Sequence, residues 1–67
     1  MPEFDDLPIV PAGNVFRSAL ISPERGGRVL EALTKAHEID PTETGTGRRV
    51  LTPRDARVLY LALTARR

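Results

Sequence analysis

Four arginines in the last third of the chain have the clearest potential for chemistry. They are Arg48, Arg49, Arg54 and Arg57. The first pair belongs to the turn-rich stretch GTGRR. The second pair is spaced three residues apart, which places both side chains on one face of a helix. Guanidinium groups on a tight loop and at the start of the next helix can together contact a phosphate backbone. The alternative interpretation is a solvated basic surface that affects only solubility.

The distribution of charge along the chain favours an anionic partner. Residues 1–43 hold four basic and eight acidic side chains, whereas residues 44–67 hold six arginines and one aspartate. A basic C-terminal surface attracts anions, and we expect this anion to be a nucleic-acid backbone. The competing explanation is chance, because a chain of 67 residues is short enough for such an asymmetry to arise without selection.

Enzymatic chemistry finds little support. The chain has no cysteine, which excludes disulfides and thiolate metal sites. His37, the single histidine, has no evident nucleophilic partner, so we expect it to pack on the apolar face of a helix. Glu38, Asp40 and Glu43 fit a solvated helix end better than a cation site. We therefore predict no catalytic residue, metal ligand or cofactor, and expect that the protein is not an enzyme.

Length and hydropathy indicate one small domain. No apolar run approaches the roughly 18 residues of a membrane span, and the N-terminus does not have the pattern of a signal peptide. We therefore expect a cytoplasmic protein without membrane contact. A domain of this size buries only about 60% of its unfolded surface, so it depends on tight packing or on a partner.

Two repeated helix-start signals organise the domain. The stretches SPER, from Ser22, and TPRD, from Thr52, each combine a hydroxyl N-cap with proline at the first helical position. They predict two main helices at about 23–38 and 53–66. The segment between them is rich in turn residues, which predicts a small β-hairpin wing at about 42–51. The expected fold class is mainly α.

The N-terminal part is less distinct. Residues 1–13 contain three prolines and predict an extended arm, followed by a single helical domain at 14–67. A short helix at 14–20, capped by Asn14, is favoured over a strand because asparagine is a good N-cap. Periodicity alone does not separate the two in so short an apolar run.

The C-terminal helix is apolar on two sides. We expect Ala56, Leu59, Tyr60 and Leu63 to face the other main helix through Leu30 and Leu33. The second stripe consists of Val58, Leu61, Ala62 and Ala65. A helix that is apolar all round is buried, so this stripe predicts a homodimer or a partner protein. In the competing arrangement, Ile9, Val10 and Phe16 fold back over it and the protein is a monomer.

The stretch GRRVLTPRDARVL resembles the wing and following helix of the MerR-type winged-helix regulators and of phage excisionases. The positions in register are Gly47, Arg49, Thr52, Asp55 and Leu59, with Ile39 and Pro41 at the entry to the wing. The resemblance implies that Arg49 contacts the DNA backbone. It also implies that the exposed side of the 23–38 helix, with Arg25, Arg28 and Lys35, enters the major groove. Glu24, Glu31 and Glu38 on the same helix oppose this, since phosphates repel carboxylates.

Two functional hypotheses follow. The first is a small DNA-binding regulator or architectural factor that binds double-stranded DNA, with Arg28, Lys35, Arg48, Arg49, Arg54 and Arg57 as contacts. The alternative is a non-enzymatic adaptor or inhibitor that binds a partner protein through the proline-rich arm and the apolar C-terminal helix.

Overall fold

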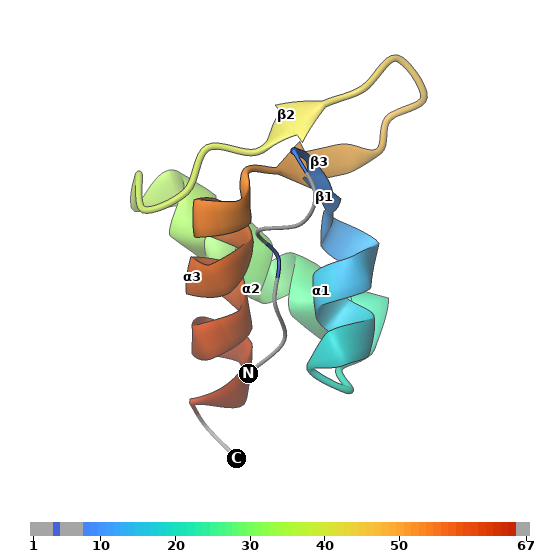
Figure 1. Cartoon of the computed structure of the whole chain (residues 1–67). Coiled ribbons are helices and arrows are strands. Elements are labelled where there is room, and N and C mark those ends of the chain that lie inside the picture. Colours follow the sequence, from blue (N-terminus) through green and yellow to red (C-terminus); the bar gives the residue numbers. More distant parts are fainter. Residues whose placement is uncertain (1–3, 5–7, 66–67) are drawn as a thin grey trace.

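The computed structural model describes Phe4 and residues 8–65 of the chain. Within these residues the order of elements is β1 (Val10–Pro11), α1 (Ala12–Ser18), α2 (Pro23–Lys35), β2 (Thr42–Glu43), β3 (Arg49–Leu51) and α3 (Pro53–Thr64). The domain is mainly α with a small β-hairpin, as the sequence predicts (Figure 1). The hairpin of β2 and β3, the wing, projects beyond the three helices.

Both predicted helix starts are confirmed. The Ser22 hydroxyl accepts a hydrogen bond from the Arg25 backbone N–H at 3.4 Å, and the Thr52 hydroxyl accepts one from the Asp55 N–H at 3.2 Å. A proline occupies the first turn of each helix, where no N–H donor is lost. α3 ends at Thr64, and residue 66, where the sequence predicts its end, lies outside the described residues.

α2 ends three residues earlier than predicted because His37 takes a left-handed conformation, with a φ of 61°. The His37 N–H donates to the Thr34 carbonyl and the Glu38 N–H donates to the Leu33 carbonyl. These two bonds form a Schellman motif, which satisfies carbonyls at the end of the helix. The expectation that His37 packs on an apolar helix face is therefore wrong, since the residue lies past the helix and is exposed.

α1 ends with the same arrangement. Leu20 has a φ of 57°, its N–H donates to the Arg17 carbonyl, and the Ile21 N–H donates to the Phe16 carbonyl. This cap turns the chain sharply into α2. Glycine is the usual residue at such a position, so neither helix end carries the customary sequence signal.

The start of α1 differs from the prediction. The helix begins at Ala12, and its N-cap is Pro11, which makes no side-chain capping bond. Asn14 lies inside the helix, where its side-chain oxygen accepts a hydrogen bond from Arg17. The start is set by β1, because Pro11 still pairs with β3 as the chain enters the helix.

The sheet joins segments that are distant in sequence. Its strand order is β1-β3-β2 and both pairings are antiparallel, with Val10 opposite Leu51 and Thr42 opposite Val50. The wing reverses at residues 44–48, where Gly47 supplies a φ of 79°. β3 leads directly into α3, so the wing is fixed to the helical core at its base.

The core lies where the three helices meet the sheet. Its fully buried large side chains are Leu30, Leu51, Leu59, Val10 and Val15. Leu33 packs against this cluster, and Leu63 is part of it, as expected for the α2–α3 contact. Tyr60 contacts Phe4 in an edge-to-face arrangement, with ring centroids 6.0 Å apart. Tyr60 packs against the core cluster and also meets the N-terminal arm at Phe4, a contact that the sequence did not predict.

Candidate nucleic-acid interface

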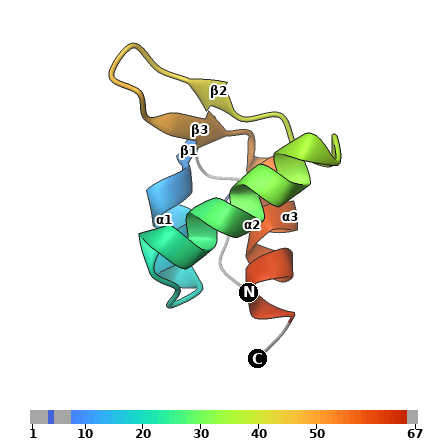
Figure 2. The same ribbon diagram turned by 180° about the vertical axis from the view of Figure 1, so that it is seen from behind.

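One side of α2 is open to solvent along its length. The helix buries Gly26 and Leu30 against the domain. The opposite side, called here the open face, consists of Glu24, Arg25, Arg28, Glu31, Ala32 and Lys35, all of them exposed. Figure 2 shows α2 crossing in front of the other helices, with no element over this side. A helix presented in this way is available for a binding partner.

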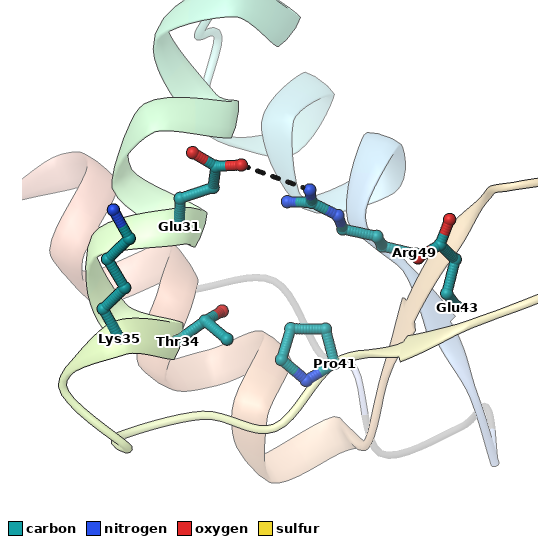
Figure 3. A pocket seen from close by; sticks show the side chains of 6 residues that line it. All are labelled: Glu31, Thr34, Lys35, Pro41, Glu43 and Arg49. Carbon is teal, nitrogen blue, oxygen red and sulfur yellow. Dashed lines mark hydrogen bonds and ion pairs between the residues drawn. The ribbon is translucent and has the colours of Figure 1, made fainter.

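The wing flanks the open face and forms a groove with it. The groove has a volume of about 280 Å³ and is lined by Glu31, Thr34, Lys35, Pro41, Glu43 and Arg49 (Figure 3). Three of these residues come from α2 and the others from the wing and the segment before it. The helix and the hairpin therefore form a continuous surface.

Arg49 connects the two sides of the groove. One guanidinium nitrogen lies 3.4 Å from a carboxylate oxygen of Glu31 (Figure 3). Arg49 points toward α2 because it alternates with Val50 along β3 and so shares a sheet face with the buried Leu51. The Arg49 and Glu31 side chains are 41% and 61% exposed, so the pair is screened by water and contributes little to stability. A phosphate can therefore compete with Glu31 for this arginine.

A second ion pair lies on the open face itself. The Arg28 guanidinium and the Glu24 carboxylate are 3.3 Å apart, one helical turn from each other. Their side chains are 77% and 80% exposed. From the sequence, three glutamates are expected to repel phosphates. Two of them, Glu24 and Glu31, are each partly neutralised by an arginine. The third, Glu38, lies beyond the end of α2 and does not line the groove.

Basic groups outnumber acidic ones on the surface formed by the open face and the wing. The basic side chains are Arg25, Arg28, Lys35, Arg48 and Arg49, and the acidic ones are Glu24, Glu31 and Glu43. Arg48 is exposed at the tip of the wing. This surface therefore has a net positive charge.

The other two predicted arginines belong to α3. Arg54 is exposed and lies 3.4 Å from the carboxylate of its neighbour Asp55. Arg57 is half-buried on the same helix. Neither lines the groove between α2 and the wing. Arg49 is thus linked by its ion pair to α2, and Arg54 is paired within α3.

Asp55 binds the segment that connects α2 to the wing. Its side chain is buried, and one carboxylate oxygen accepts a hydrogen bond of 3.1 Å from the Asp40 backbone N–H. The bond ties the segment between α2 and β2 to the start of α3. The sequence placed Asp55 in register with the winged-helix pattern but did not predict this bond, because a partner 15 residues away leaves no local signal. It likewise missed the pairing of Glu31 with Arg49.

The second apolar stripe of α3 is divided in the structure. Val58 packs against the core, and Ala62 lines a groove between α2 and α3. Leu61 is 52% exposed, and Ala65 is also exposed. Of the arm residues, Val10 is buried in the core, as is Phe16 of α1, whereas Ile9 is exposed. The uncovered part of the stripe is therefore small.

The described residues form neither a metal site nor a membrane-spanning helix. No group of three or more His, Cys, Asp or Glu side chains there is arranged to hold a metal ion. The helices formed by these residues are too short or too polar to cross a bilayer.

Comparison of the chain with protein-family models, with curated proteins and with solved structures finds no match.

Proposed function

We propose that the protein binds double-stranded DNA as a small winged-helix regulator or architectural factor, with α2 in the major groove and the wing on the adjacent backbone. The observation that supports this proposal is the groove in which α2 and the wing meet, bridged by Arg49 and Glu31. Through this groove, the exposed face of α2 and the wing form one continuous surface. The basic side chains outnumber the acidic ones on both.

The dimensions of the open face suit DNA. α2 has 13 residues and is therefore about 20 Å long. The major groove is about 12 Å wide and admits one α-helix. With α2 in the groove, the wing lies to one side of the helix, where Arg48 and Arg49 can contact phosphates. Lys35, at the end of α2, can do so as well.

The salt dependence of binding tests this function. The affinity for a random-sequence duplex should be measured by fluorescence anisotropy between about 50 and 200 mM salt. The logarithm of the association constant should fall linearly with the logarithm of the salt concentration, with a slope of about −0.9 per phosphate contact. Arg49→Ala should weaken binding to all sequences alike and reduce the slope by about one. Arg54→Ala is the matched comparison, because it removes the same charge outside the groove. Absence of binding at low salt contradicts the proposal.

The exposed part of α3 favours a second role in assembly, as a homodimer or with a partner protein. On the outward side of α3, the large apolar side chain of Leu61 is exposed to solvent, and the small Ala65 follows one turn later. A dimer through this side would present two copies of α2 to two half-sites. Sedimentation of the wild-type protein and Leu61→Glu at micromolar concentration tests the assembly. A wild-type dimer that Leu61→Glu converts to folded monomers supports it, and a wild-type monomer contradicts the homodimer.

A further inference from the structure

We infer that Arg28 selects guanine in the DNA site and that Glu24 orients the Arg28 guanidinium for this contact. The inference rests on the proposed function, because it assigns a base contact to the helix that the proposal puts in the major groove. A base contact adds sequence specificity, which the phosphate contacts do not supply because they carry no sequence information.

Arg28 has the position that a base contact needs. It lies near the middle of the open face, and its side chain is 77% exposed. One turn later the same face carries Ala32, which is exposed and small. No bulky neighbour at that position keeps α2 away from the floor of a groove. Lys35 follows near the end of the helix, where it reaches the backbone rather than the bases.

The chemistry of the guanidinium specifies the base. Guanine presents two adjacent acceptors, O6 and N7, in the major groove, and a planar guanidinium donates to both at once. Adenine offers only N7 beside an amino donor, cytosine offers a donor, and thymine offers a single acceptor beside a methyl group. A lysine in the same place supplies the charge without the two parallel donors. Arginine on an exposed helix face therefore distinguishes guanine from the other bases.

Glu24 restricts the arginine without occupying it. Its carboxylate contacts one terminal nitrogen of Arg28, Nη2, at 3.3 Å across one helical turn. The other guanidinium nitrogens, Nη1 and Nε, make no hydrogen bond or ion pair with a described residue. Because both side chains are exposed, the contact biases the orientation of the guanidinium only weakly, and its other donors stay available for a base. Arg25 makes no ion pair with a described residue, and its side chain has no such orientation.

The experiment selects binding sites from a randomised duplex library at fixed salt. The wild-type protein should enrich guanine at one position, and exchange of that guanine for adenine in a single duplex should weaken binding about tenfold. Arg28→Lys should lose this discrimination while its affinity for random DNA stays within about twofold, because the charge is kept. Arg25→Lys is the matched control and should retain the preference.

Glu24→Gln tests the positioning role. This variant should discriminate guanine less well than wild type although its affinity for random DNA is equal or higher, since a negative charge is removed. Circular dichroism confirms that each variant is folded. If Arg28→Lys keeps the guanine preference, or wild type enriches no guanine, the inference is wrong while DNA binding stands. If the wild-type protein shows no salt-dependent binding, the proposed function fails and the inference fails with it.

Discussion

The aromatic ring of Phe16 lies directly against the backbone of Gly26. A Cβ atom at position 26 would stand 2.8 Å or less from three carbons of the ring. Both residues are buried, and the contact joins α1 to α2. A glycine in the interior of a helix costs about 1 kcal/mol in helix propensity, and here it allows the two helices to meet. The contact lies on the buried side of α2, opposite the open face.

Gly26→Ala should therefore destabilise the domain by about 1–2 kcal/mol, because forcing a methyl group into a packed core costs more than the gain in helix propensity. Gly27→Ala is the matched control. A Cβ there meets nothing within 4 Å, so this variant should be more stable than wild type by about 0.5–1 kcal/mol. Urea denaturation followed by circular dichroism measures both changes. Equal effects of the two substitutions would show that Phe16 does not require the glycine.

Leu20→Gly should raise the free energy of unfolding by about 0.5–1 kcal/mol, since glycine adopts the positive φ of the α1–α2 turn without steric cost. The substitution removes no core contact, because Leu20 is 83% exposed. Leu20→Ala separates the two possible causes. It removes the same apolar side chain but keeps a Cβ, so its stability should be close to that of wild type. A gain with alanine as large as with glycine would assign the effect to exposure and not to φ.

Asp55→Ala should cost about 1–3 kcal/mol of stability, because it leaves the Asp40 N–H without its acceptor. Asp40→Ala is the control. It keeps the backbone N–H and changes an exposed side chain, so its effect should stay within about 0.5 kcal/mol. Thermal unfolding measures both variants. The prediction fails if the two substitutions are equally mild.

Glu31→Gln should strengthen binding to random duplex DNA by several-fold at low salt. The substitution releases Arg49 from its ion pair and removes a negative charge from the groove. Glu38→Gln changes the net charge equally but lies outside the groove, so it should have a smaller effect. Anisotropy titrations at two salt concentrations compare the variants. Identical gains for both would mean that only net charge matters and that the Glu31–Arg49 pair has no part in binding.

The sequence by itself determined the features that depend on neighbours within a single turn. Ser22 and Thr52 start α2 and α3 because each hydroxyl needs only the N–H three residues ahead. The wing follows from the clustered turn residues between the two helices. These interactions are local, so residue types and spacing are sufficient to predict them.

Tertiary structure alone decided where α1 and α2 end and how the candidate interface is assembled. Leu20 and His37 adopt a positive φ that their side chains disfavour, so neither residue type signals the helix end that it forms. Arg49 could have extended toward α3 or toward solvent. It meets Glu31, 18 residues earlier, because β3 lies between β1 and β2 and turns that face toward α2. Pairings of this kind depend on the path of the whole chain, which no short stretch of sequence encodes.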